Sequence, residues 1–402
     1  MKSNILEILK IPEVSTKRHY WIIRTNGGIY YQDFILHEYI SISWDYITLN
    51  ILNNENEDAI KRLIGMYAGN LNEEIDLDDE ETDGSSKGKV TAIYNKIHRF
   101  VFEISRGDIV LIPSSNSDFI TIAEVTGDVY ENPNYVETRL LKDPDSETVP
   151  CPYYKRRKIR TLKTIEKGKM DIYLTKGFYS QHALSSMDDY APYIDRTIYG
   201  IYSKGDEVHT TIHAGHPNGL TLKELVSLST LLEESASSLA HQCGIPFDSS
   251  DVEVKLNIHS PGLIELIGAT SGIGIALSLL IFSINNVING GKISISFKRD
   301  KESGDLDFSV NSESVGLKGH NEDGIRLELQ KKKELLEMVA ALDIKSPEII
   351  SSIINGEKVT TNMISESQKA PTVPKHKIKR HIRFKNNTTN NALPSDSDDA
   401  ME

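Results

Sequence analysis

The stretch that decides the fold is Trp21–Leu49, which reads WIIRTNGGIYYQDFILHEYISISWDYITL. It opens with an apolar, β-branched run that ends at Asn26-Gly27-Gly28, as a strand does when it closes in a turn. Residues 30–37 could form a short helix, and Ile40–Trp44 alternates with the two-residue period of a strand. The stretch therefore predicts a strand, a glycine turn, a short helix and a second strand.

A second stretch, residues 98–130, has the same β character and reads HRFVFEISRGDIVLIPSSNSDFITIAEVTGDVY. Arg106-Gly107-Asp108 predicts a tight turn before a strand at Ile109–Ile112. Asn116-Ser117-Asp118 predicts a hairpin turn, and Phe119–Val125 is the returning strand. Together the two stretches predict a small twisted β-barrel.

These stretches resemble the PUA-like, or EVE-like, domain at the N-terminus of Mrr-type restriction endonucleases and other bacterial defence proteins. The shared pattern is W-x-x-R, a glycine-rich turn, a phenylalanine, an I-x-W-D strand, an F followed by GD-x-V, and a G-E-V-x-G segment closed by tyrosine. In this chain the pattern is carried by Trp21 and Arg24, Gly27-Gly28, Phe34, Ile42 with Trp44-Asp45, Phe100 with Gly107-Asp108-Ile109-Val110, and residues 123–130. Ala123 stands where the family pattern has glycine. The resemblance covers about residues 17–205 and would make Arg157–Leu162 the last barrel strand.

The resemblance implies a pocket that binds RNA, or that holds a modified or flipped base between an aromatic ring and polar groups. Stacking would supply roughly 1–3 kcal/mol per base, and hydrogen bonds to base edges would supply discrimination. The candidate ligand-binding residues are Trp21, Arg24, Tyr30, Trp44 and Asp45. The alternative is that both tryptophans fill the barrel core and that Arg24 and Asp45 form a structural ion pair.

A basic run at residues 155–163 is the candidate surface for a nucleic-acid backbone, because arginine forks match phosphate geometry. If 157–162 is a strand, Arg157 faces one way while Lys158 and Arg160 face the other, so only part of the run can form one patch. The alternative is a solvated edge strand protected by charge. The candidate phosphate-binding residues are Lys155, Arg156, Arg157, Arg160 and Lys163.

Length and composition indicate a two-domain protein of a reducing compartment. The 402 residues can hold two domains with separate cores. The net charge of −13 excludes nucleic-acid binding through overall charge, so any such contact must be local. Cys151 and Cys243 form no C-x-x-C motif, and MKSNILEILK lacks the apolar core of a signal peptide. We expect a cytoplasmic protein without a cofactor.

Three parts are expected along the chain. Residues 1–205 form the PUA-like module, which begins with a leader helix at 1–16 and is interrupted by a flexible acidic loop at 70–90. Residues 206–365 form a smaller α+β domain, and residues 366–402 form a disordered tail. The fold class is therefore α+β, with an N-terminal PUA-like β-barrel followed by an α+β domain that has one buried hydrophobic helix.

The C-terminal half contains an uncharged run, Leu266–Ile284, that is long enough for a transmembrane helix. The interpretation we prefer divides this run between a strand and a buried helix. Val252–Ile258 and Leu263–Ile267 would form a hairpin, and the helix would begin near Ser271 and end at Asn289-Gly290-Gly291. Strands at 292–297 and 305–310 would complete a β-β-α-β-β order, which suits a helix packed on a sheet.

Capping chemistry marks another helix of this half. Thr221 and Glu224 form a capping box, with Thr221 as N-cap and Glu224 reaching back, and the helix should run to about Gln242. Two further helices are expected at 324–342 and from 346 to about 355.

Three histidines could form a zinc site if they shared a helix face. His209, His213 and His216 have a suitable spacing. The β-branched residues between them and the glycine and proline beside His216 argue against a helix. We therefore expect no metal.

Glu253-Val254-Lys255 has the E-x-K half of a PD-(D/E)xK nuclease. Such a site needs a second acid on a neighbouring strand to share a metal ion. Asp248 and Asp251 are too close in sequence to lie across a hairpin, and a strand of alternating charge explains the triplet equally well.

Three functions follow from these observations. In the first, the protein is the ligand-sensing module of a bacterial anti-phage or restriction-type system. Its barrel binds nucleic acid with a modified or unpaired base, or a nucleotide-like ligand, and its C-terminal domain binds a partner protein or forms a homo-oligomer. The second is an effector of the inner membrane that uses helix 266–284, and the third is a metal-dependent nuclease that uses Glu253 and Lys255. We prefer the first, since no established catalytic motif is present.

Overall fold

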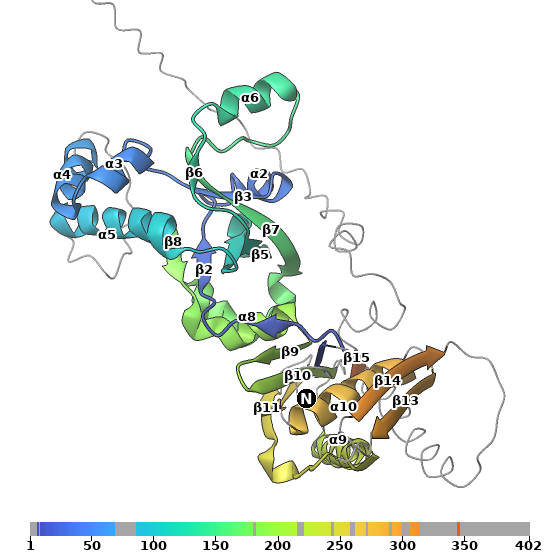
Figure 1. Cartoon of the computed structure of the whole chain (residues 1–402). Coiled ribbons are helices and arrows are strands. Elements are labelled where there is room, and N and C mark those ends of the chain that lie inside the picture. The colour runs from blue at the N-terminus through green and yellow to red at the C-terminus, as the bar shows by residue number, and fades with distance from the viewer. Residues whose placement is uncertain are drawn as a thin grey trace, which may run out of the picture. The chain divides into compact units, whose positions relative to one another are not determined.

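The computed structural model describes the residues in the following ranges: 6–7, 9–68, 86–179, 182–214, 221–242, 245–257, 262–270, 272–288, 292–299, 306–313 and 344–345. All of them belong to the compact unit Met1–Thr360. The fold is mixed α+β, with a curled half-barrel sheet in the N-terminal region and a second sheet with two long helices after it (Figure 1).

The N-terminal sheet has the strand order β3-β7-β5-β4-β2-β8, with β6 beside β7. Strands β2 and β4 are parallel and the other neighbours are antiparallel. The register between β5 and β7 shifts between Ile122 and Ala123, where Leu162 is the extra residue on β7, and a bulge of this kind bends its strand. The strands are β2 (Tyr20–Ile23), β3 (Tyr39–Ile42), β4 (Ile109–Pro113), β5 (Phe119–Val125), β6 (Tyr130–Glu131), β7 (Lys155–Glu166) and β8 (Leu184–Ser186).

Helices cover this sheet because both of its faces are apolar. In β2, Trp21 and Ile23 join one core cluster while Tyr20 and Ile22 join another on the opposite face. The first cluster also contains side chains of the helical segment between β3 and β4. The helices are α2 (Tyr31–Leu36), α3 (Leu49–Asn54), α4 (Glu57–Ala68), α5 (Ser86–His98), the π-helix η1 (Arg99–Glu103), α6 (Tyr135–Lys142), α7 (Ile172–Thr175) and α8 (Ala191–Ile198).

The glycine turn after β2 is required by a close backbone approach. Gly28 has a φ of +93°, and a Cβ built there would lie 2.3 Å from the backbone nitrogen of Ser115. Ser115 belongs to the short 3₁₀ helix η2 (Ser115–Ser117) between β4 and β5. The two stretches that define the barrel in the sequence therefore meet at a point where only glycine fits.

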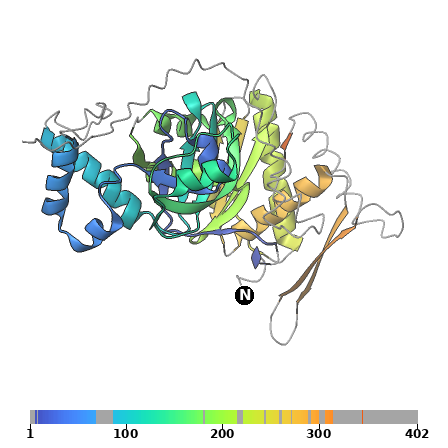
Figure 2. The ribbon, with the colours of Figure 1, turned by 90° about the horizontal axis from the view of Figure 1, so that it is seen from above.

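The second sheet has the order β1-β9-β10-β12-β11, with β15 also paired to β10. Its neighbours are antiparallel except for β1 and β9. Helices α9 (Leu222–Gln242) and α10 (Ile273–Ile288) cover one face (Figure 2), and β13 (Lys292–Arg299) and β14 (Leu306–Glu313) form a separate hairpin. The strands are β1 (Glu13–Val14), β9 (Ile201–Lys204), β10 (Glu207–Ala214), β11 (Glu253–Asn257), β12 (Gly262–Ala269) and β15 (Ile344–Lys345).

The apolar run 266–284 is divided between two elements, as the preferred interpretation predicts. Its first residues belong to strand β12, which pairs with both β10 and β11, and from Ile273 on it belongs to α10. Residues Ile273–Ile281 of α10 are buried in the core beneath the sheet. In the described part of the chain, no helix has both the length and the apolar character needed to cross a membrane.

The structure corrects two local expectations. Residues 13–14 form strand β1, so the leader helix at 1–16 is wrong there, and the acidic loop ends earlier than 90 because α5 begins at Ser86. His209 and His213 lie on strand β10, which agrees with the expectation that these histidines are not on a helix. His216, the tail 366–402 and the helices expected at 324–342 and 346–355 lie outside the described residues.

The expected domain boundary after residue 205 falls in the tight turn between β9 and β10. Gly205 occupies this turn with a φ of +60°, and the two strands pair from Ile201 to Thr210. Residues 1–205 therefore contribute β1 and β9 to the second sheet.

The capping box predicted for α9 is present. The backbone N–H of Glu224 donates to Thr221 Oγ1 at 3.2 Å, and the backbone N–H of Thr221 donates to Glu224 Oε2 at 2.8 Å. Thr221→Ala should lower the free energy of unfolding by about 1 kcal/mol, because it leaves orphan N–H groups at the helix start. Urea denaturation of this variant beside Thr221→Ser, which keeps the hydroxyl, measures the effect. A loss as large in Thr221→Ser would show that the cap is not responsible.

Candidate functional site

Trp21 lines a cleft of about 740 Å³ beside strands β2 and β8. Four separate segments of the N-terminal region form its walls, so the cleft depends on the tertiary fold. The lining residues are His19, Trp21, Arg99, Glu103, Lys176, Gly177, His182, Ser185, Ser186, Met187, Asp188 and Tyr190. Its volume lies in the range of small-molecule sites, which is roughly 300–1,000 Å³.

Asp108 fixes the position of Trp21 in the cleft. The indole Nε1–H of Trp21 donates to Asp108 Oδ2 at 3.1 Å, and the backbone N–H of His19 donates to Asp108 Oδ1 at the same distance. Asp108 Oδ2 also accepts from the backbone N–H of Ser105 at 2.9 Å. The Gly107-Asp108 turn that marks β4 in the sequence thus supplies the carboxylate that orients the aromatic ring.

Asp188 fixes the second aromatic ring of the cleft, that of His19. His19 Nδ1 lies 2.9 Å from Asp188 Oδ2, and the backbone N–H of Tyr20 donates to Asp188 Oδ1 at 2.7 Å. The hydrogen bond to Asp188 raises the pKa of His19, although partial burial opposes the shift. The ring centroids of His19 and Trp21 lie 6.3 Å apart with planes tilted by 48°.

The described lining residues include two permanent cations, Arg99 and Lys176, and two carboxylates, those of Glu103 and Asp188. Protonation of His19 therefore makes this lining positive. A cleft of this kind can bind a ligand that combines a flat apolar part with an anionic part. Sequence reasoning identified Trp21 alone among these residues, because only Trp21 lies in the family pattern.

Arg24 lies near the cleft and holds one of its bordering segments. Its Nη2–H donates to the carbonyl oxygen of Phe178 at 2.8 Å, and its backbone N–H donates to that of Ala183 at 2.9 Å. Arg24 thus connects β2 to the chain on both sides of the lining residue His182.

The other candidate ligand residues, Tyr30, Trp44 and Asp45, gather around Lys155 and its neighbours. The carbonyl oxygen of Trp44 accepts from Lys155 Nζ at 2.9 Å, and Asp45 Oδ1 accepts from the backbone N–H of Tyr154 at 2.9 Å. Tyr30 packs edge-on against Tyr153 with ring centroids 5.4 Å apart. Burial raises the pKa of Asp45, and all three side chains contact the barrel core or its polar border.

The basic run forms strand β7, and the structure places its first three cations inside the protein. Lys155, Arg156 and Arg157 are buried, and each binds backbone carbonyl groups. Arg160 is on the surface and pairs with Glu124, and Lys163 is half-buried. The expected phosphate-binding surface is therefore wrong for the three buried residues. The alternative of a charged edge strand is also wrong, since β7 lies between β3 and β5.

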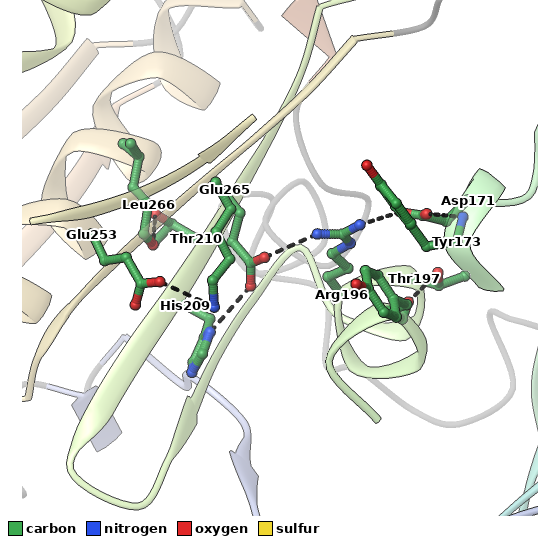
Figure 3. A network of polar contacts seen from close by, with 11 residues as sticks. Asp171, Tyr173, Arg196, Thr197, His209, Thr210, Glu253, Glu265 and Leu266 are labelled. Atoms are coloured by element: carbon green, nitrogen blue, oxygen red, sulfur yellow. Dashed lines mark hydrogen bonds and ion pairs between the residues drawn. The ribbon is translucent and has the colours of Figure 1, made fainter. Parts of the chain in front are cut away.

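A buried polar network joins α8 to the second sheet (Figure 3). Arg196 Nη1 donates to Glu265 Oε2 at 3.1 Å, its Nη2 donates to Asp171, and His209 Nδ1 lies 3.1 Å from Glu265 Oε1. Burial would raise the pKa of Glu265, but hydrogen bonds from His209 and Arg196 and the nearby positive charge lower it. Sequence reasoning missed this network because its members are distant along the chain.

Glu265 is the acidic residue to consider as the second acid of a nuclease site with Glu253 and Lys255. It lies directly opposite Lys255 in the β11–β12 pair, where a PD-(D/E)xK site would need its second acid. Its carboxylate is bound by Arg196 and His209, and Glu253 pairs with Lys255 at 3.5 Å. Within the described residues, no group of three or more His, Cys, Asp or Glu side chains could hold a metal ion.

The comparisons with known proteins cover only a part of the chain that lines the cleft. A family model described as a domain of unknown function (DUF8426) matches residues 21–178. No curated protein and no solved structure matches the chain. The matched segment contains the lining residues from Trp21 to Gly177, whereas His19 and the lining residues at 182–190 lie outside it.

Proposed function

We propose that the N-terminal half-barrel binds an unpaired or modified nucleobase, or a nucleotide-like ligand, in the cleft beside Trp21. The observation that carries this proposal is the combination of oriented aromatic rings with cations in one cleft. Asp108 and Asp188 hold the rings of Trp21 and His19 in place, and Lys176 lies on the same lining.

In this proposal the base stacks on the aromatic rings of the cleft and the phosphate binds its cations. Trp21 is 4% exposed, so its ring forms the floor of the cleft. The side chain of His19 is largely exposed. Base stacking on such rings contributes roughly 1–3 kcal/mol and tolerates different bases. Arg99 and Lys176 are the lining groups that can bind a phosphate whatever the protonation of the histidines.

The two tryptophans of the chain allow a direct test, because each can be made the sole fluorescent reporter. In a Trp44→Phe protein, nucleoside 5′-monophosphates and short single-stranded oligonucleotides should change the emission of Trp21. In a Trp21→Phe protein, the same ligands should leave Trp44 emission unchanged. Lys176→Gln should lower the affinity for the monophosphates about tenfold, since a charge-assisted bond to phosphate is lost. It should change the affinity for the corresponding nucleosides little.

Lys163→Gln is the matched control, because it removes a lysine that does not line the cleft. The affinity for monophosphates should also fall as pH rises through the raised pKa of His19, since the neutral ring no longer attracts an anion. His19→Gln should remove that part of the pH dependence. The absence of any Trp21 response to nucleosides, monophosphates or oligonucleotides at low salt would refute the proposed site.

We also propose the wider role that the resemblance implies. The half-barrel is then a PUA-like domain. The protein acts in the cytoplasm as the ligand-sensing module of a bacterial anti-phage or restriction-type system, while the region after residue 205 binds a partner or forms a homo-oligomer. The W-x-x-R and I-x-W-D segments and their places on β2 and beside β3 support this role.

A further inference from the structure

We propose that strand β11 pairs antiparallel with β11 of a second copy of this chain, which joins the second sheets of two molecules. This inference rests on the proposed oligomerising role of the region after residue 205. It does not depend on ligand binding in the cleft, which the tryptophan experiment tests separately.

Strand β11 is the last strand of its sheet in the part of the chain that the structure describes. It pairs with β12 over Glu253–Asn257 on one side. A strand at a sheet edge presents backbone N–H and C=O groups that can pair with another chain. The side chains of Glu253, Val254, Lys255 and Leu256 are all exposed, so a pairing strand can reach this edge.

The charges of β11 select a second copy as the partner and set its register. If Val254 lies opposite Val254 of the second copy, Glu253 of each molecule lies opposite Lys255 of the other. A register centred on Glu253 or on Lys255 would instead place like charges opposite each other, which destabilises an antiparallel pair. In the free chain Glu253 and Lys255 pair with each other at 3.5 Å, and exposed pairs of this kind contribute little. They can therefore exchange partners readily.

The apolar side chains of β11 support the same arrangement. Val254 and Leu256 lie opposite Leu266 and Ile264 of β12, so they share the sheet face that packs against α9 and α10. Leu266 and Ile264 are buried, whereas Val254 is 51% and Leu256 is 45% exposed. Pairing through β11 would continue this apolar face into the second molecule and would cover the exposed side chains. Because the strand is short, we expect a weak dimer that forms as concentration rises.

A charge exchange on β11 tests the inference in the full chain. Glu253→Lys places lysine opposite lysine in the proposed register, and should raise the dimer dissociation constant at least tenfold. The double variant Glu253→Lys, Lys255→Glu restores opposite charges and should restore dimerisation. Light scattering after size-exclusion chromatography, over a range of protein concentrations, measures all three proteins. The Trp21 response should be the same in each.

Cysteine substitution then tests the register. In a background with Cys243→Ser, mild oxidation should link Val254→Cys molecules, because the two residues lie opposite each other, while native Cys151 is buried. Lys255→Cys is the control, since its two copies would be diagonal neighbours, beyond the Cα separation that a disulfide allows. A protein that remains monomeric at every concentration would overturn the inference and the oligomerising role. An oligomer that is insensitive to Glu253→Lys, or equal linking of both cysteine variants, would overturn the β11 interface alone.

Discussion

Arg196→Met is expected to lower the free energy of unfolding by roughly 3–5 kcal/mol, because it leaves two buried carboxylates without their cation. Arg196 is almost fully buried, and it pairs with Asp171 on one side and with Glu265 on the other. Methionine conserves most of the apolar packing, so the loss in free energy of unfolding measures the effect of removing the positive charge. Urea denaturation followed by circular dichroism measures it.

Arg106→Met is the matched control for this prediction. Arg106 forms a two-pronged pair with Asp128, but both side chains are mostly exposed, at 63% and 76%. An exposed pair contributes about 0–1 kcal/mol, so the same substitution should have little effect there. If both variants lost the same free energy of unfolding, the buried ion pairs of Arg196 would not stabilise the protein more than an exposed pair does.

The pH dependence of the free energy of unfolding tests the same network independently. The pKa of Glu265 is lowered in the folded protein, so its stabilising contribution is present above the unfolded value of about 4.3 and is lost as pH falls below it. In Arg196→Met, protonation of Glu265 removes a poorly paired buried charge. Acidification should therefore destabilise the variant less than it destabilises the wild-type protein.

The parts of the fold that were predicted correctly are those governed by local chemistry. Turn residues and the β character of the segments between them predicted β4 and β5. The structure has these strands at Ile109–Pro113 and Phe119–Val125. The Thr221 cap placed the start of α9 in the same way. By contrast, the neighbours of each strand depend on contacts between distant segments. The pairing of β1 with β9 and the position of β7 between β3 and β5 therefore had no signal in the sequence.

The candidate site was predicted only in part for a related reason. Trp21 was identified because it stands in a recognisable pattern, but Lys176, His182 and Asp188 join it only through the fold. The opposite error was made for the basic run. A row of lysines and arginines indicates a charged surface as long as the partners of its side chains are unknown. Here the partners of Lys155 and Arg157 are carbonyl groups of distant segments.

Arg157 decides between these two interpretations of the basic run. Its guanidinium donates to the carbonyl oxygens of Phe100 and Val101, at 2.8 Å each, and to that of Gly127 at 3.3 Å. Arg157→Met should therefore lower the free energy of unfolding by roughly 3 kcal/mol, because buried carbonyl groups lose their donors. Under conditions in which this variant is folded, its Trp21 response to nucleoside monophosphates should match that of the wild-type protein.

Arg160→Met is the control, three residues further along β7 on the opposite face. Its side chain is 46% exposed and pairs with Glu124, so its replacement should cost less than about 1 kcal/mol. Urea denaturation and the Trp21 titration, applied to both variants, separate a structural role from a binding role. If Arg157→Met instead retained wild-type stability and bound single-stranded oligonucleotides more weakly at low salt, its guanidinium would have to leave the three carbonyl groups to contact phosphate. The basic run would then be a nucleic-acid surface, as the sequence pattern alone predicts.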